Sequence, residues 1–362
     1  MIKKIAILGA GNGGCAFAGH LAMKGFEVGL YEDPKFGKNI EAVKARGGVE
    51  LTGKVEGFGS FSNATTNIKD VLPGADVVMV VVPAFVQPLF MERALPYLED
   101  GQIVVFNPDN FGSLVFRHML KSKGVEKKVK IAGTASLLYA CRLIAPAKVG
   151  IWYVKDIMPV AALPSGDTEG IVKSLNELFP LYSPANNVLE VSFGNVNLAL
   201  HCPTAVLNAG RIEDTKGNFM FYWEGMTESV CRAMEKLDEE KIKVAEKVGF
   251  KLMSTLGYLR QYYRSEKAGK DLHDFVTHSR AHGGRGPDAP KDLHHRYLSE
   301  DVPNGLVPVS LFGKLVNVQT PVIDSVISLS SIMNETDYFK EGRTLEKMGL
   351  SGWSCKEMLD SI

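Results

Sequence analysis

The 362-residue sequence contains few cysteines, no excess charge of either sign and no long apolar run. Its five cysteines are scattered and form no CxxC pair, which argues against a disulfide framework or a zinc site and favours a reducing compartment. Lys plus Arg and Asp plus Glu each number 41, so the formal net charge is zero. No global electrostatic field therefore attracts nucleic acid or an anionic membrane.

The first apolar run, within MIKKIAILGAG, is only a few residues long before glycine interrupts it. It is too short for a secretory signal or a membrane span. Together with the cysteine pattern, this predicts a cytoplasmic protein with neither nucleic-acid nor membrane partners. The chain is too long for one ordinary hydrophobic core, so we expect two domains with a cleft between them.

The N-terminal half alternates short apolar strands with helical or loop stretches. Residues 5–8 form a β-branched run that ends in GAGNGG, and the next stretch, 15–26, has helical spacing. Continuous apolar strands that alternate with helices predict an α/β fold with a Rossmann-type, doubly wound parallel sheet. The remaining expected strands are 27–33, 75–84, 101–108 and 129–134.

From about Val188 the pattern changes to long helical segments, expected at 195–213, 224–247 and 320–333. Few strands are predicted beyond that point. We therefore predict two domains, residues 1–187 and a mainly α-helical domain over residues 188–362.

The turn after the first strand carries a GxGxxG motif at the start of a helix. In this context the first glycine permits a tight turn, the second admits a pyrophosphate, and the third lets helix and strand pack closely. Residues 1–187 are thus predicted to bind a dinucleotide. The predicted contact residues in this turn are Gly9, Ala10, Gly11, Asn12, Gly13 and Gly14.

Glu32 follows the second strand at the distance expected for an acid that accepts hydrogen bonds from the adenosine ribose. An acid there favours NAD over NADP, although Lys35 and Lys38 could tolerate a 2′-phosphate. At the end of the third strand, a turn at the carboxyl edge of the sheet is expected to line the cofactor-binding site. The alternative is an ordinary loop with no role in cofactor binding. This turn consists of Val82, Pro83 and Ala84.

The stretch NVNLALHCPTAVLNAGR predicts an apolar helix with a polar stripe and a histidine at its middle. The polar residues recur at spacings of four, three, four and three, so they share one face. A dehydrogenase that moves a hydride must also move a proton, and an imidazole suits that task. A histidine satisfied within the core is the alternative. The stripe consists of Asn197, His201, Thr204, Asn208 and Arg211.

Asp324 lies in an otherwise apolar or hydroxylic helix that begins with Thr320 as N-cap and Pro321 at the first position. We expect its carboxylate to orient His201 and to stabilise the imidazolium. An acid stabilised by the helix N-terminus is the alternative. Five further histidines, at 273, 278, 282, 294 and 295, lack the spacing of a metal site, and no metal is predicted.

These stretches resemble the opine dehydrogenase family, most closely its N-(1-D-carboxyethyl)-L-norvaline dehydrogenase type. The similar segments span nearly the whole chain in order. They are LGAGNGGCAFAGHLAMKG, VVVPA, LLYACR, NVNLALHCPTAVLNAGRIE, FYWEGMTESV, EDVPNGLVPVS, TPVIDSV and EGRTLEKMGLSG.

The resemblance implies that NADH or NADPH drives the reductive joining of an amino acid's α-amino group to a 2-oxo acid such as pyruvate. It implies a catalytic histidine–aspartate pair, here His201 and Asp324, and a homodimer. The product carries two carboxylates, which need cations. Candidate substrate-binding residues are Cys141, Arg142, Asn197, Thr204, Arg211 and Arg296. For each arginine the alternative is a structural ion pair, and for Cys141 the alternative is a buried, inert thiol.

The chain departs from the resemblance at Gly133, where relatives carry glutamate, and at Asp109, which lies in NPDNFGS where they carry a glycine-rich turn. Two alternatives follow for the function. One is a hydroxy-acid or glycerol-phosphate-type dehydrogenase, although such enzymes commonly carry a lysine on the first helix of the second domain, where this chain offers histidine. The other is a dinucleotide-binding sensor without turnover.

Overall fold

The computed structural model of the protein describes residues 1–266 and 269–362, and the chain divides into two compact units. Unit 1 is Met1–Val191 and unit 2 is Ser192–Ile362. The expected boundary after residue 187 lies four residues before this division. The division falls inside helix α6 (Val188–Phe193) rather than in a loop.

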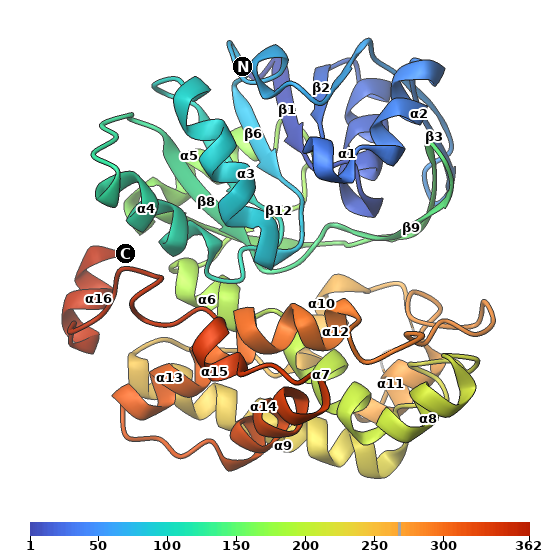
Figure 1. Cartoon of the computed structure of the whole chain (residues 1–362), viewed down its shortest axis with the longest axis vertical. Coiled ribbons are helices and arrows are strands. Elements are labelled where there is room, and N and C mark those ends of the chain that lie inside the picture. Colours follow the sequence, from blue (N-terminus) through green and yellow to red (C-terminus); the bar gives the residue numbers. More distant parts are fainter. Residues whose placement is uncertain (267–268) are drawn as a thin grey trace. The chain divides into compact units, whose positions relative to one another are not determined.

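Unit 1 is built around an eight-stranded sheet that is parallel except where β8 meets β11 (Figure 1). Residues 5–8 of β1 pair with 28–31 on one side and with 77–80 on the other, and all are buried. Strands buried on both faces are typical of a parallel sheet covered by helices. The predicted Rossmann-type fold is confirmed. Across the sheet, the strands are β12 (Tyr182–Pro184), β11 (Met158–Leu163), β8 (Lys130–Thr134), β7 (Ile103–Phe106), β6 (Val77–Val80), β1 (Lys4–Leu8), β2 (Glu27–Tyr31) and β5 (Asn63–Thr65).

The sequence pattern does not predict a second, four-stranded sheet in unit 1. Strands β3 and β4 each contain two glycines, and the apolar residues of β9 do not alternate with polar ones, so these strands give no clear apolar period. Helix α1 (Asn12–Met23) contacts strands of both sheets, and a Cβ on Gly59 would overlap the backbone of Gly19 in α1. Glycine at 59 therefore lets the small sheet pack directly on the helix. In order, the strands are β4 (Gly57–Ser60), β3 (Gly48–Gly53), β10 (Lys148–Val154) and β9 (Tyr139–Ala145).

Most of the other helices of unit 1 connect strands of the main sheet, whereas α2 leads from β2 to β3 of the small sheet. Helix α4 contacts both α3 and β8 (Figure 1). The α-helices are α2 (Lys38–Arg46), α3 (Gln87–Ala94), α4 (Gly112–Ser122) and α5 (Thr168–Leu175), and the short 3-10 helices are η1 (Pro34–Phe36), η2 (Ile68–Asp70), η3 (Ala84–Val86), η4 (Leu95–Tyr97) and η5 (Ser165–Asp167).

In unit 2 the described residues form helices joined by turns and loops, with no strand among them. The helix expected over 195–213 is two helices, because the chain turns at Asn208, whose side-chain amide donates to the carbonyl of Thr204. The expected helices at 224–247 and 320–333 are found as α9 and α14. The helices are α7 (Asn197–Leu207), α8 (Ala209–Thr215), α9 (Glu228–Val248), α10 (Thr255–Tyr262), α11 (Leu272–His278), α12 (Arg296–Ser299), the π-helix η6 (Val302–Leu306), α13 (Val307–Leu315), α14 (Pro321–Met333), α15 (Tyr338–Glu341) and α16 (Cys355–Ser361).

Helix α9 organises unit 2, since it contacts α7, α11, α13 and α14. Met234, Leu237 and Val244 on this helix are fully buried. Burying a side chain of that size stabilises the fold by about 1.5–3 kcal/mol. This packing holds α7, which carries the histidine, in place within the unit.

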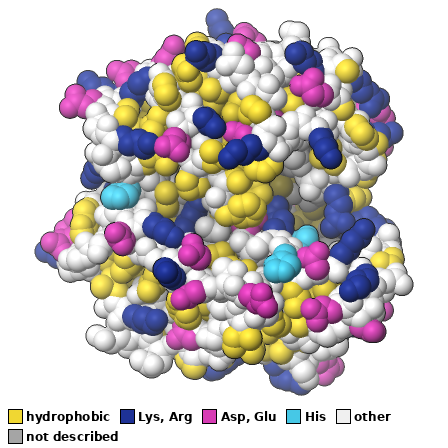
Figure 2. Space-filling model, in the orientation of Figure 1, with side chains coloured by type: hydrophobic (Ala, Val, Ile, Leu, Met, Phe, Trp, Pro, Cys, Tyr) yellow, Lys and Arg dark blue, Asp and Glu magenta, His cyan; other side chains and the backbone are white. Residues whose placement is uncertain are grey.

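No helix of the described residues is both long and apolar enough to cross a membrane. Basic and acidic side chains are interspersed over the visible face of the molecule (Figure 2). This distribution agrees with the zero net charge of the chain.

Candidate active site

The glycine turn between β1 and α1 has the geometry that the sequence predicts. Gly9 adopts φ 111°, a conformation that favours glycine, and its amide donates to the carbonyl of Tyr31 at 2.8 Å. A Cβ on Gly14 would overlap the carbonyl oxygen of Gly9. These two glycines are therefore required by the fold itself.

Gly11 differs from the other two glycines, because a Cβ built on it would meet nothing within 4 Å. The open space lies at the N-terminal end of α1, for which Gly11 is the N-cap. Amide groups and the helix dipole favour an anion at such a position. The residues present therefore fit the pyrophosphate of a dinucleotide.

The other predicted contact residues of the turn pack against their surroundings. The side-chain oxygen of Asn12 accepts from the amide of Leu143 at 2.8 Å, and a Cβ on Gly13 would crowd Leu137. Val82 lies against Gly9, since a Cβ on that glycine would overlap its side chain. Within unit 1, the VVVPA turn therefore lies against the glycine turn.

Glu32 is 7% exposed, and both its carboxylate oxygens accept backbone hydrogen bonds. Oε2 accepts from the amide of Ala10 at 2.7 Å, and Oε1 accepts from the amide of Asp33 at 3.0 Å. Burial raises the pKa of Glu32, which the two amide hydrogen bonds oppose. The Glu32 carboxylate thus holds the glycine turn through the Ala10 amide, an interaction that the sequence does not predict.

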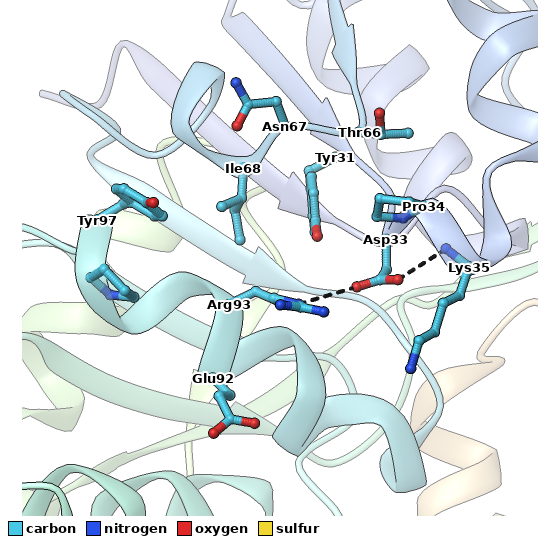
Figure 3. A pocket seen from close by; sticks show the side chains of 11 residues that line it. Tyr31, Asp33, Pro34, Lys35, Thr66, Asn67, Ile68, Glu92, Arg93 and Tyr97 are labelled. Carbon is cyan, nitrogen blue, oxygen red and sulfur yellow. Dashed lines mark hydrogen bonds and ion pairs between the residues drawn. The ribbon is translucent and has the colours of Figure 1, made fainter.

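A pocket of about 590 Å³ opens beside the end of β2 (Figure 3). Tyr31, Pro34 and Tyr97 give it apolar walls, and Asp33 and Arg93 give it a charged pair. The Asp33 side chain is 1% exposed, and its Oδ2 lies 3.6 Å from Nε of Arg93. That oxygen accepts no hydrogen bond within the described residues. The pocket thus combines flat apolar walls with a carboxylate that can accept from hydroxyls.

The two departures from the family resemblance lie against each other in unit 1. A Cβ on Gly133 would overlap the side chain of Asp109. The Asp109 carboxylate accepts from the Ser113 amide at 2.9 Å and from its hydroxyl at 3.0 Å, at the start of α4. A larger side chain at 133 is therefore incompatible with Asp109 in this position.

In unit 2, the carboxylate that binds His201 is Asp301, which stands directly before η6. His201 Nδ1 lies 2.8 Å from Oδ2 of Asp301, and the two residues are 7% and 1% exposed. Burial lowers the pKa of His201 and raises the pKa of Asp301. The pair thus favours a neutral imidazole and a shared proton, in a site with little water.

The predicted pairing of His201 with Asp324 is wrong. Asp324 Oδ1 accepts from the hydroxyl of Ser310 at 2.5 Å. Both ring nitrogens of His201 have other partners, Asp301 at Nδ1 and the Tyr222 hydroxyl at Nε2, 2.9 Å away. The sequence favoured Asp324 because it is one acid in a helical apolar segment, whereas Asp301 stands before a π-helix that has no such periodicity.

Two further side chains that the sequence did not predict, Tyr297 and Glu300, lie near this pair together with the predicted Arg296. The Tyr297 ring stacks on the imidazole, with centroids 3.9 Å apart and planes 26° apart. Glu300 is buried and binds Nε of Arg296 at 2.7 Å. Arg296 is a predicted substrate residue whose side chain is 45% exposed, and its charge lowers the pKa of Asp301. The EDVPNG segment, which carries the family resemblance, was the signal that could have located Asp301.

The other predicted substrate residues divide between the two units. Cys141 and Arg142 lie on β9 of unit 1, where burial raises the pKa of the Cys141 thiol to about 12. In unit 2, the Thr204 hydroxyl donates to the sulfur of Met234 on α9 at 3.6 Å. Arg211 pairs with Glu224 at 3.2 Å and lies over the Phe219 ring. These contacts pack Thr204 and Arg211 against their neighbours, and their part in substrate binding stays a prediction.

Asn197, the remaining residue of the predicted set, begins α7 and is partly buried. Its backbone amide donates to the Asn195 side chain at 3.0 Å. Among the predicted substrate residues, Arg296 acts on the histidine–aspartate pair, since its charge lowers the pKa of both His201 and Asp301.

The fold and the two sites define a dehydrogenase with a dinucleotide-binding domain and a helical domain that carries a histidine–aspartate pair. Residues 184–334 match the family described as NAD/NADP octopine/nopaline dehydrogenase, alpha-helical domain. Residues 4–132 match the N-terminus of NAD-dependent glycerol-3-phosphate dehydrogenase.

Similar proteins identify the family. The chain is 36% identical to an opine dehydrogenase of Arthrobacter sp. (strain 1C) over 362 residues, 99% of both chains. It is 24% identical to the vitopine synthase of Allorhizobium ampelinum over all of this chain and 99% of that one. The chain belongs to the opine dehydrogenase family, whose members are NAD(P)-dependent oxidoreductases that act on CH–NH bonds.

A solved structure of octopine dehydrogenase in complex with NADH and agmatine shares the fold, with a TM-score of 0.78 and 20% identity over 99% of this chain and 98% of that one. A yersinopine dehydrogenase with NADP⁺ bound is similar at a TM-score of 0.67 and 14% identity, over 99% and 97% of the two chains.

Proposed function

We propose that this protein reductively condenses the α-amino group of an amino acid with a 2-oxo acid, such as pyruvate, and catalyses the reverse oxidation. The observation that carries the proposal is the buried His201–Asp301 pair, which lies in the region that matches the octopine dehydrogenase helical domain. Octopine dehydrogenase structures that hold NADH with L-arginine or with pyruvate support the substrate class.

When bound, NAD(P)H would supply the hydride that reduces the C=N bond between the two substrates. The space above Gly11 and the first amides of α1 hold the pyrophosphate. His201 moves the proton that the nitrogen gains in this direction and loses in the reverse one. Asp301 accepts the Nδ1 hydrogen, which fixes the tautomer and stabilises the imidazolium.

Arg296 is the proposed partner for a substrate carboxylate. Its side chain is 45% exposed, while the Glu300 carboxylate that holds it is 1% exposed. An arginine fixed from one side by an acid presents its remaining N–H donors in a set direction, and these match a carboxylate. Arg142 and Asn197 remain further candidates for substrate contacts.

For the cofactor, we propose a preference for NADH. Asp33 is buried at the pocket beside β2, and one of its oxygens accepts no hydrogen bond within the described residues. In this proposal that oxygen accepts from the 2′-hydroxyl of the adenosine ribose, and Glu32 supports the turn next to it. A 2′-phosphate at the same place would be repelled by the carboxylate.

The screen that tests the proposed function crosses several 2-oxo acids with several amino acids and follows NADH oxidation. Activity that requires both substrates, and that falls at least about 100-fold in His201→Ala, supports the proposal. Oxidation with the oxo acid alone indicates a hydroxy-acid dehydrogenase, and NADH binding without turnover indicates a sensor. A cytoplasmic location and a homodimer likewise remain proposals, and light scattering tests the latter.

A further inference from the structure

The Tyr222 hydroxyl lies 2.9 Å from Nε2 of His201, the ring nitrogen that faces away from Asp301. Asp301, His201 and Tyr222 therefore form one continuous hydrogen-bonded line within unit 2. When Nδ1–H donates to the carboxylate, Nε2 is the acceptor, and the phenol donates to it.

The line runs from the interior of the unit toward its surface. Asp301 is 1% exposed and His201 is 7% exposed, while Tyr222 is partly exposed. Tyr222 is thus the most exposed member of the line, and its hydroxyl, which also forms a hydrogen bond with Tyr297, covers Nε2. A molecule that exchanges a proton with His201 in this arrangement meets the Tyr222 hydroxyl first.

The position of Tyr222 is fixed by the neighbours of its ring and backbone. Its ring packs edge-on against Phe221, with centroids 5.4 Å apart, and lies 5.1 Å from the His282 ring. The backbone amide of Phe221 donates to Oδ1 of Asp288 at 2.7 Å, which ties this segment to a distant part of the chain. A phenol held in this way is oriented before any substrate arrives.

We propose that Tyr222 is a further catalytic residue, which relays the proton between His201 and the nitrogen of the substrate. The inference rests on the proposed function. As hydride adds to the imine carbon, the phenol O–H bond breaks toward the imine nitrogen, and Nε2–H of the imidazolium transfers its proton to the phenol oxygen. The phenol is neutral before and after, the C=N bond becomes CH–NH, NADH becomes NAD⁺, and His201 ends neutral.

The electrostatics of the phenol agree with this role. Burial raises the pKa of Tyr222 well above its usual value, so its hydroxyl stays protonated and can accept and donate at once. The charged groups near His201 are Arg296 and Glu300. The polar and titratable groups near Tyr222 are Tyr297, His282 and Asp288. A relay needs no phenolate, because each proton that leaves the oxygen is replaced by another.

The test compares Tyr222→Phe with the parent protein in mixtures of H₂O and D₂O, using substrates that show activity and 4-deuterated NADH to expose the chemical step. We expect kcat to fall about 100-fold or more, with a much smaller change in KM for either substrate. If two protons move in the same transition state, a plot of the parent's kcat against the deuterium fraction of the solvent is curved. The same plot for Tyr222→Phe should be linear.

Tyr338→Phe is the matched control, because it removes a buried phenol that accepts from the Asn334 amide at 2.7 Å in the same unit. It should retain the parent's kcat and its curved dependence. If Tyr222→Phe does not fold, fluorotyrosine at 222 keeps the size and alters the acidity of the phenol, and kcat should change with that acidity.

A Tyr222→Phe variant that keeps the parent's kcat and curvature would overturn the relay, as would a faster variant, since the phenol would then only cover Nε2. An equal loss of activity in Tyr338→Phe would also overturn it. Failure of the proposed function looks different, because the parent itself would then oxidise no NADH with any pair of substrates.

Discussion

Nδ1 of His201 and Oδ2 of Asp301 lie 2.8 Å apart although the two residues are 100 positions apart in the chain. Helix α7 supplies the imidazole, and the residue before the π-helix η6 supplies the carboxylate. This contact makes His201 part of a polar line rather than an isolated core histidine, and it assigns Asp301 the orienting role that the sequence analysis gave to Asp324.

Exchanging each acid for its amide distinguishes the two aspartates. Asp301→Asn should lower kcat by about 100-fold to 10,000-fold, because the amide stabilises neither the correct tautomer nor the imidazolium. Asp324→Asn should keep kcat within about twofold of the parent and change the unfolding free energy by about 1 kcal/mol or less, because its amide oxygen can still accept from the Ser310 hydroxyl. Steady-state kinetics and urea unfolding measure both; a larger kcat loss in Asp324→Asn contradicts the assignment.

The rate of the reductive reaction should depend on pH through the same pair. Burial raises the pKa of Asp301 to about 7, so the pair takes up one proton below that value and loses it above. Since reduction consumes a proton, log kcat should fall with a slope near −1 above about pH 7, and the oxidation should show the opposite trend. The measurement is kcat at saturating substrates, so that titration of the free amino-acid substrate does not contribute to the pH profile. If kcat changes with pH in the same direction for reduction and for oxidation, the prediction is wrong.

The unfolding free energy should depend only weakly on pH through this pair. Asp301 has a raised pKa in the folded state, so its contribution to stability decreases as pH rises toward about 7. His201 has a lowered pKa, to about 3, so its contribution decreases as pH falls below its unfolded value of about 6.5. Between about pH 4 and 6.5 the folded and unfolded pair each hold about one proton, and the slopes cancel.

Two glycines of the same motif should respond differently to substitution. Gly11→Val should leave the melting temperature nearly unchanged, because a side chain there meets open space, but should weaken NADH binding about 100-fold or more. Gly14→Ala should lose about 3 kcal/mol or more of unfolding free energy, since its methyl group would overlap the Gly9 carbonyl. Calorimetry and fluorescence titration with NADH give both values. Equal NADH affinity in the parent and Gly11→Val excludes this turn as the pyrophosphate site.

The choice between the two cofactors should depend on Asp33. Asp33→Ser removes the carboxylate that faces Arg93, so the ratio of kcat/KM for NADPH to that for NADH should rise about 10-fold or more. Glu32→Gln should instead reduce stability, because both carboxylate oxygens accept backbone hydrogen bonds in the folded state. Kinetics with both cofactors check this; an unchanged ratio in Asp33→Ser means that the ribose is bound elsewhere.

The sequence predicts the parts of the protein that depend on local interactions. The turn from Gly9 to Gly14 is one such part, because strand, glycines and helix follow each other within a few residues. His201 is another, since the apolar period of α7 identifies its helix. The pattern overestimates that helix, however, because it cannot detect the turn at Asn208 that separates α7 from α8.

Contacts between distant segments are not encoded in any local pattern. Strands β3 and β10 pair in parallel although about 100 residues separate Glu50 from its partner Lys148, and no local apolar pattern indicates this pairing. The same limit explains why Asp301, at the start of the π-helix η6, and Tyr222, in a turn, are not predicted to contact His201. Their polar groups are recognisable only once the helices of unit 2 have packed.

The most direct test of the central claim is mass spectrometry of the product formed with 4-deuterated NADH, a 2-oxo acid and an amino acid. We predict a secondary amine whose mass is that of both substrates joined with loss of water and gain of one deuterium and one hydrogen, with the deuterium on the carbon that was the ketone. A deuterated hydroxy acid beside unchanged amino acid would contradict it.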